Sequence, residues 1–419
     1  MDANEITTPR GPSRRSVLAV GTALLTLGVP VGTAAARTRD ARVRLRLPAP
    51  TGPHPVGTRS LRLVDRSRRD PWTGAPVREL MVDVRYPARS VAGHARAAQM
   101  TAGEAAGFDR LNNFGGLPAD RVDWAATRTF AHTGAPADRH AARSVVLYSP
   151  GVLDPRTLGT TLTDELASRG HVVVAIDHPY DVSAVEFPDG RVVTSRLPQE
   201  FEAAQQAGPD AVTALLKKTA AVRVADVRFV LDVLDDVLRD ALGDAAPCGA
   251  PVGVFGQSAG GFAALQALHD DPRIAAAADL DGVLAYVQDD HDEGGLSTVA
   301  AQGVDRPFLL MGSDGDDRTT VPSWRELWRH STGWRRDLTV RGSGHATYTD
   351  AATLLPQVAD RLGLPRETLT GWVGTVPAAR AVAAQRVYVT AFFDRWLRDR
   401  DDDGLLDGPS PRFPEVTFV

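Results

Sequence analysis

The 419-residue sequence holds a single cysteine, Cys248, and only two lysines, Lys217 and Lys218. One cysteine excludes a disulfide framework, and no histidine stands near it in the sequence, so Cys248 is expected to be an ordinary thiol. The chain also lacks a basic excess, because its formal net charge is −5 at pH 7. This composition gives no sign of a nucleic-acid partner.

Internal repeats and long low-complexity linkers are absent as well. A chain of this length often divides into two or three domains, but a continuous α/β sheet can absorb most of it. Hydrophobic residues make up 43% of the sequence, which is enough for a large core. We expect residues 37–419 to form a single domain with a C-terminal helical extension.

The first 36 residues have the pattern of an export signal. Arg14 and Arg15 precede the apolar run AVGTALLTLGVPVG, and small residues follow at Ala34 to Ala36. The run is too short for a membrane span and contains glycine and proline. We therefore predict a twin-arginine signal over residues 1–36, and a mature protein secreted from a bacterium. No cysteine follows the signal to carry a lipid anchor.

The order of expected elements indicates an α/β protein. Two segments that alternate in hydrophobicity come first and read as antiparallel strands, and later apolar runs read as buried parallel strands with helices between them. One long amphipathic helix is expected near 211–239. The sequence thus predicts an α/β-hydrolase fold, a mostly parallel central sheet with antiparallel N-terminal strands and helices on both faces. The expected strands are Ser60 to Val64, Val77 to Tyr86, Val145 to Tyr148, Val172 to Ile176, the segment before Ser258, Ile274 to Leu280, Phe308 to Met311 and, as the last, Leu338 to Val340.

The segment Pro251 to Leu268 carries the main chemical signal. It joins an apolar strand to a small-residue helix through Gly256-Gln257-Ser258-Ala259-Gly260, the pattern of a nucleophile elbow. The glycines allow the sharp turn that exposes the serine hydroxyl. Ser258 is therefore the candidate nucleophile of a serine hydrolase.

The candidate base is His345. It follows the last expected strand in the loop Arg341-Gly342-Ser343-Gly344-His345, where glycines let the loop cross the top of the sheet. The other nine histidines lack either this chain order or the flanking glycines. A serine nucleophile needs such a base within hydrogen-bond reach.

The acid that orients the base has more than one candidate. Asp281 follows the strand that ends at Leu280, whereas Asp314 and Asp316 follow the next strand. Either strand end could place a buried carboxylate beside His345. Most α/β hydrolases use the later position, so the residues alone leave both open.

Two backbone N–H groups are the candidate oxyanion donors. Ala259 begins the helix after the nucleophile, where N–H groups have no helical acceptor. The second donor is expected in the loop Ser149-Pro150-Gly151-Val152, at Val152.

An acidic run near the C-terminus has the first half of a calcium loop, Asp399-x-Asp401-x-Asp403-Gly404. Its twelfth position is Ser410, where a bidentate glutamate is required. An acidic helix end explains this run better, and we expect no metal and no cofactor.

Taken together, these motifs resemble the platelet-activating factor acetylhydrolase family of the plasma, lipoprotein-associated type, an α/β-hydrolase family. The likeness runs from about Leu61 to Asp350. It includes the elbow itself, Arg85-Tyr86-Pro87, Leu147-Tyr148-Ser149-Pro150-Gly151, Leu166 to His171 ahead of Asp177-His178, Leu280-Asp281-Gly282, and Gly342 to His345 with Asp350 five residues on.

The resemblance implies a site as well as a fold. It implies Ser258 as nucleophile, His345 as base and Asp281 as acid, with Val152 and Ala259 as the oxyanion donors. Three positions depart from the family pattern, since Gln257 and Pro150 each replace a histidine and Ala259 replaces a larger aromatic residue. The acyl pocket is therefore expected to differ.

The function expected from these residues is hydrolysis of short or truncated acyl esters by an acyl-enzyme mechanism. The substrate would be a small-molecule or lipid ester, such as a phospholipid, and contact with a lipid surface would accompany a lipid substrate. One alternative is a polyester hydrolase or cutinase-like esterase, which would favour Asp314 or Asp316 as the acid. Another is a non-catalytic binding protein on a hydrolase scaffold. The sequence does not give the oligomeric state.

Overall fold

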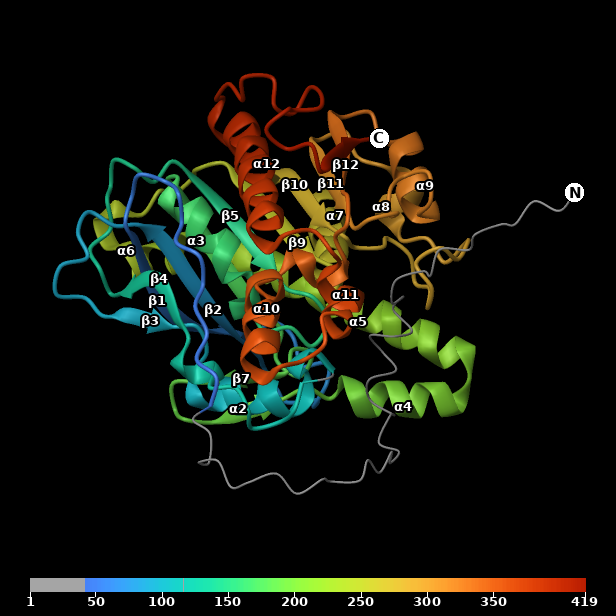
Figure 1. The fold of residues 1–419 in the computed structure, drawn as a ribbon, viewed down its shortest axis with the longest axis horizontal. Coiled ribbons are helices and arrows are strands. Elements are labelled where there is room, and N and C mark those ends of the chain that lie inside the picture. The colour runs from blue at the N-terminus through green and yellow to red at the C-terminus, as the bar shows by residue number, and fades with distance from the viewer. Residues whose placement is uncertain (1–41, 116) are drawn as a thin grey trace, which may run out of the picture.

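A single large sheet runs through the protein (Figure 1). In residues 42–115 and 117–419, which the computed structural model describes, eleven strands lie in the order β13-β12-β11-β10-β9-β5-β6-β2-β1-β4-β3. The predicted export signal, residues 1–36, lies outside the described residues. Six neighbouring strands are parallel: β5 (Ser144–Ser149), β6 (His171–Asp177), β9 (Val252–Gln257), β10 (Ile274–Leu280), β11 (Phe308–Gly312) and β12 (Arg335–Val340).

The N-terminal strands are antiparallel, as the sequence predicts. β1 (Val56–Asp65) pairs with β2 (Arg78–Pro87), and β2 runs antiparallel to β6. With helices on both faces of the sheet, this topology is an α/β-hydrolase fold.

Side chains alternate between the two faces of the central strands, because successive residues of a strand point in opposite directions. In β5, Val145 and Leu147 pack into one buried cluster, whereas Val146 and Tyr148 pack into another. Both faces are therefore apolar, which explains why these strands are continuous hydrophobic runs.

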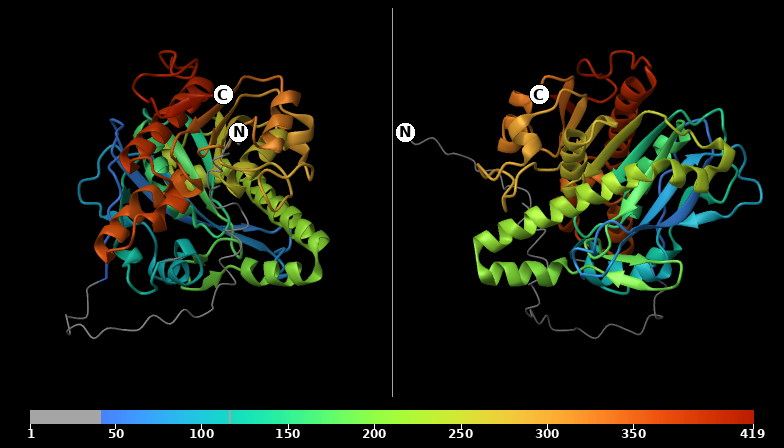
Figure 2. Two further views of the ribbon diagram at one scale, coloured as in Figure 1. Left: turned by 45° about the vertical axis from the view of Figure 1, so that its right-hand side comes forward. Right: turned by 180° about the vertical axis from the view of Figure 1, so that it is seen from behind.

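The helices divide between these faces (Figure 2). One face is covered by α5 (Pro209–Asp232), α6 (Leu234–Leu242), α7 (Ala259–Asp270), α8 (Thr298–Gln302) and α9 (Pro322–His330). The other is covered by α3 (Thr160–Ser168) and α12 (Ala378–Arg398). α12, predicted as part of a C-terminal extension, lies so close to β9 that a Cβ on Gly253 would be 2.6 Å from the Phe393 ring.

The prediction of a single helix near 211–239 is wrong, because two helices occupy this stretch. Val233 leaves the helical conformation at φ −110° and ψ 14°, and α6 begins at the next residue. Asp235 and Asp236 stand in the first turn of α6, where they favour a new helix start. The break lets α6 bury Leu234, Val237 and Leu238.

α5 also extends further toward the N-terminus than expected. Together with α4 (Leu197–Ala207) it forms a helical hairpin that projects from the body of the protein (Figures 1 and 2). Gly208, at φ 109°, makes the tight link between the two helices. Apolar side chains of the two helices form a cluster with Trp72, and Val152 and Leu153 pack against this cluster.

The expectation that Leu338 to Val340 belongs to the last strand is also wrong. β13 (Val416–Phe418) pairs antiparallel with β12 and closes that edge of the sheet. The opposite edge is formed by β4 (Arg128–Thr133) and β3 (Arg96–Ala98), and β7 (Ala184–Glu186) and β8 (Val192–Thr194) form a separate hairpin. Strands of three residues are too short to show an alternating pattern.

Three further helices pack together: α2 (Ala102–Leu111), α10 (Ala351–Leu362) and α11 (Glu367–Val373). They bury apolar residues together in a cluster that includes Phe108, Phe114 and Leu354. Among the described residues, no helix combines the length and the apolar character that crossing a bilayer would need.

Candidate active site

Ser258 lies at a strained corner between β9 and α7. Its backbone has φ 57° and ψ −125°, a conformation that costs energy in any residue except glycine. The surrounding chain enforces it, because a Cβ on Gly260 would lie 1.9 Å from the Ser149 carbonyl oxygen, and one on Gly256 would lie 2.2 Å from the Gly260 carbonyl carbon. The elbow therefore requires glycine at both positions.

His345 begins a short 3₁₀ helix, His345–Tyr348, in the loop after β12. Gly342, at φ 73°, turns the chain, and Gly344 packs so close to α11 that a Cβ there would lie 2.7 Å from the Trp372 carbonyl oxygen. The loop brings His345 Nδ1 to 2.6 Å from Asp281 Oδ2.

Asp281 is held in place by the strand ends around it. Its φ is 62°, its N–H donates to the Met311 carbonyl, and its Oδ1 accepts from the Ser313 N–H at 2.6 Å. Only Oδ2 is left to face His345. Asp281 thus has the geometry of a carboxylate that fixes the imidazole tautomer with Nδ1 protonated.

The two alternative acids point elsewhere. Asp316 accepts from the Ser313 hydroxyl at 2.9 Å and lies 3.1 Å from His291 Nε2, and Asp314 is exposed. Burial and the neighbouring Asp281 carboxylate raise the pKa of Asp316 to about 6. Ser313 therefore contacts both strand-end carboxylates, but only Asp281 contacts His345.

The loop after β5 is held from behind by a buried arginine. Arg223, on α5, is fully buried and donates to the carbonyl oxygens of Pro150 and Gly151, the latter at 2.9 Å. Its Nε also donates to Asp181 Oδ2 at 2.8 Å. With its carbonyls bound to Arg223, this loop leaves Val152 to line the cavity in front of Ser258.

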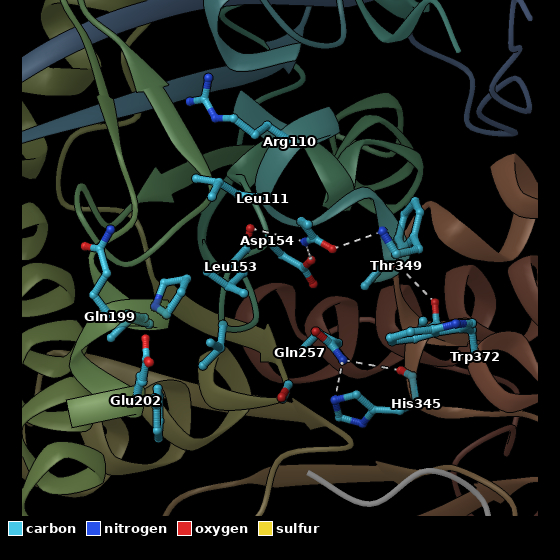
Figure 3. A pocket seen from close by; sticks show the side chains of 18 of the residues that line it. Arg110, Leu111, Leu153, Asp154, Gln199, Glu202, Gln257, His345, Thr349 and Trp372 are labelled. Carbon is cyan, nitrogen blue, oxygen red and sulfur yellow. Dashed lines mark hydrogen bonds between the residues drawn. The ribbon is translucent and has the colours of Figure 1, made fainter. Parts of the chain in front are cut away.

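Gln257, which departs from the family pattern, lies against the candidate base. Its Nε2 is 3.1 Å from His345 Nε2 and donates to the His345 carbonyl oxygen at 3.3 Å, as the dashed lines of Figure 3 show. An amide at this position adds a second fixed neighbour to the imidazole, opposite Asp281.

Ser258 and His345 line a cavity of about 340 Å³. Figure 3 shows Gln199 and Glu202 of α4 on one side of it and Trp372 on the other. Its walls mix apolar and polar side chains from α2, α4, the loop after β5, the His345 loop and α11. The apolar members include Leu111, Phe114, Val152, Leu153, Leu197, Phe201 and Trp372.

A second carboxyl group, Asp154, faces the same cavity. Asn112 Nδ2 donates to its Oδ1 at 2.7 Å. Burial raises the pKa of Asp154 to about 6, against the effects of that hydrogen bond and of His345 and Arg223. The sequence analysis missed Asp154, although a carboxylate three residues after Gly151 in an oxyanion loop was a usable signal.

A Ser-His-Asp arrangement that does not include Ser258 is buried in the core. His178 contacts Ser149 Oγ through Nε2 and Asp226 Oδ2 through Nδ1, each at 2.9 Å. All three side chains are fully buried, so no substrate can reach them. Asp226 also pairs with the buried Arg78 at 2.8 Å. This network connects the ends of β5 and β6 to α5 and supports the loop that carries Val152.

Two carboxylates within the acidic run after α12 pair with arginine. Asp402 and Asp407 lie 3.3 Å and 3.2 Å from Arg395 Nη1. In the described part of the chain, no group of three or more His, Cys, Asp or Glu side chains is arranged to hold a metal ion.

No family model matches the chain, but comparison with known proteins shows similarity to esterases. A protein of Arthroderma benhamiae (strain ATCC MYA-4681 / CBS 112371), a probable 1-alkyl-2-acetylglycerophosphocholine esterase, is 29% identical over 395 residues, which cover 89% of this chain and 93% of that protein. The solved ferulic acid esterase from Streptomyces cinnamoneus is 35% identical, with a TM-score of 0.70, and the match covers 90% of this chain and 99% of that one.

Proposed function

The chain belongs to the platelet-activating factor acetylhydrolase family of α/β-hydrolase esterases, and we propose that it is a secreted serine esterase that acts on short or truncated acyl esters. Both relatives are carboxylic ester hydrolases, and so is this protein. The serine mechanism, the export and the substrate are the proposal. The observation that carries it is the 2.6 Å contact between His345 and Asp281, with His345 and the strained Ser258 lining one cavity.

In the proposed reaction, Ser258 Oγ forms a bond to the ester carbonyl carbon while its proton passes to His345 Nε2. Asp281 stabilises the imidazolium, and the N–H groups of Val152 and Ala259 bind the oxyanion. The tetrahedral intermediate then expels the alcohol, which takes its electron pair from the broken C–O bond and its proton from His345. Water, deprotonated by His345, repeats the sequence on the acyl-enzyme and releases the acid.

The preferred substrate class is an ester with a short acyl group, as the acetyl ester named for the Arthroderma benhamiae relative suggests. A cavity of about 340 Å³ holds a short acyl chain and part of the alcohol, and a lipid would leave its long chains outside. Export by the twin-arginine route would place the enzyme outside the cytoplasm.

Esters of aromatic acids are a second candidate class. The ferulic acid esterase is the relative with the higher identity, and Phe114 and Trp372 give this cavity aromatic walls. Both candidate classes use the same chemistry at Ser258 and differ only in what fills the cavity.

A hydrolysis screen separates these possibilities. Purified protein would be tested on p-nitrophenyl esters from acetate to laurate, on vesicles of a 2-acetyl phospholipid, and on methyl ferulate, with Ser258→Ala as the control. Labelling of the wild type by a fluorophosphonate, absent in Ser258→Ala, tests the nucleophile directly. Wild-type turnover that persists in Ser258→Ala would contradict the proposed mechanism, and lack of turnover on every ester would contradict the proposed substrates.

A further inference from the structure

The two oxygens of the Asp154 carboxyl group have different surroundings. Asn112 binds Oδ1, while Oδ2 has no hydrogen-bond donor in the described part of the chain. Asp154 lines the cavity, so a molecule bound there can reach Oδ2. A molecule that displaces water from this oxygen must supply a donor of its own, because a carboxylate oxygen without a donor is unfavourable once water is excluded.

Asp154 is also close to the reacting centre. A Cβ built on Gly151 would lie 2.4 Å from Gln257 Oε1, 3.0 Å from Asp154 Oδ2 and 3.4 Å from Ser258 Cβ, so the three side chains border the same small volume. A donor bound to Oδ2 would therefore lie only a few bonds from the carbonyl carbon that Ser258 attacks.

The donor is expected to be neutral. His345 lies near enough to act electrostatically on Asp154, and it becomes positively charged when it takes the Ser258 proton. A cationic substrate group at Asp154 would oppose that charge. An O–H donor has no such cost, and it forms a charge-assisted hydrogen bond with the carboxylate.

We propose that Asp154 selects hydroxy esters, in which a hydroxyl group within about three carbons of the ester donates a hydrogen bond to Asp154 Oδ2. Partial esters of polyols carry this hydroxyl on the alcohol side, and hydroxyacyl esters carry it on the acyl side. The inference rests on the proposed esterase function and adds a specificity-determining residue to it.

The test uses two pairs of substrates that differ in the donor. On the alcohol side the pair is 2-hydroxyethyl acetate and 2-methoxyethyl acetate, and on the acyl side it is p-nitrophenyl 3-hydroxybutyrate and p-nitrophenyl butyrate. We expect the wild type to prefer the hydroxy member of at least one pair by about 10- to 100-fold in kcat/KM, the range that a hydrogen bond to a charged group supports. The pair that shows the preference identifies the side of the ester.

Asp154→Asn tests the residue, because its amide oxygen can still accept from Asn112. In this variant the preference for the hydroxy substrate should fall below about 3-fold, which is less than a single hydrogen bond contributes to kcat/KM. Asp154→Ala gives the same readout if the asparagine variant does not fold. Glu202→Gln changes the other carboxylate of the cavity and should keep the preference.

Three results would overturn the inference. They are a wild type with no preference in either pair, an equal preference in wild type and Asp154→Asn, and a preference that disappears in Glu202→Gln instead. None of these results contradicts the proposed function, which fails if the wild type hydrolyses none of the tested esters or if Ser258→Ala hydrolyses them equally well.

Discussion

His345 Nδ1 lies 2.6 Å from Asp281 Oδ2, although 64 residues separate them in the sequence. The contact joins the loop after β12 to the end of β10, and β11 lies between these two strands in the sheet. It fixes which ring nitrogen of His345 is left to face the cavity.

Replacing Ser258 or His345 should abolish turnover. Ser258→Ala and His345→Ala are each expected to lower kcat by about 10⁴-fold or more, because members of a triad act as a unit. Steady-state kinetics measures the loss, and circular dichroism checks that the fold is intact. A near-normal rate in either variant would show that the reaction uses another residue.

Asp281→Asn should lower kcat by about 10³- to 10⁴-fold, because an amide permits the wrong imidazole tautomer. Asp314→Asn is the matched control, since Asp314 is exposed, and its rate should stay close to that of the wild type. Asp316→Asn should also have a small effect, because Asp316 binds Ser313 rather than His345. A large loss at Asp314 or Asp316 with a nearly normal Asp281→Asn would instead support the polyester-hydrolase alternative.

Gly260→Ala should destabilise the protein by about 3 kcal/mol, as overpacking against a fixed backbone does. The added Cβ would meet the Ser149 carbonyl oxygen at 1.9 Å, and this oxygen cannot move without disturbing the loop that carries Val152. Urea unfolding gives the free energy. Gly408→Ala, with no atom within 4 Å of the added Cβ, is the control and should change it by less than about 0.5 kcal/mol. Equal losses of stability in the two variants would mean that the elbow has room for a side chain at position 260.

Asp226→Asn should lower the free energy of unfolding by about 3 kcal/mol at pH 7, because it removes one of the two carboxylates, those of Asp226 and Asp70, that pair with the buried Arg78. Burial opposes the ionisation of Asp226, but Arg78 and the hydrogen bond from His178 outweigh it and hold the pKa of Asp226 well below its ordinary value. Arg68 also pairs with this carboxylate.

Because folding lowers the pKa of Asp226, its contribution to the free energy of unfolding depends on pH. In the unfolded chain Asp226 binds a proton below about pH 4, while in the folded protein it stays ionised. The stabilisation that Asp226 gives the folded protein is therefore complete above about pH 4 and is lost as the pH falls further. The difference between wild type and Asp226→Asn should shrink on acidification. Asp210→Asn, an exposed change in the first turn of the same helix, should lower the free energy of unfolding by no more than about 1 kcal/mol, the range of a charge–dipole interaction.

Removal of divalent cations should leave activity and stability unchanged. The proposed mechanism uses no metal, and Asp402 and Asp407 of the acidic run pair with Arg395. Rates and melting temperatures measured with and without excess chelator check this. Loss of activity on chelation, restored by calcium, would make the run at 399–410 a calcium site.

The sequence by itself determined the parts of the protein that depend on local chemistry. The elbow can be recognised in the sequence because the strained conformation of Ser258 and the close approach of Ser149 to Gly260 require glycines at fixed spacing. The parallel strands can be predicted because burial on both faces makes each one a continuous apolar run. The catalytic roles of Ser258, His345 and Asp281 stay predictions.

Only the tertiary structure decided which carboxylate meets His345 and what else faces the cavity. Asp281 and Asp316 follow neighbouring strands, and the local residue pattern leaves both open, although the family resemblance implies Asp281. Their difference lies in where Ser313 and the His345 loop direct each side chain. Asp154 and Arg223 look like ordinary polar residues until the fold brings one to the cavity and the other behind Gly151. The position of Asp154 three residues after Gly151 was a local signal. Contacts between residues far apart in the chain leave no periodic pattern, so the contacts of Asp154 and Arg223 arise only when the sheet and helices are assembled.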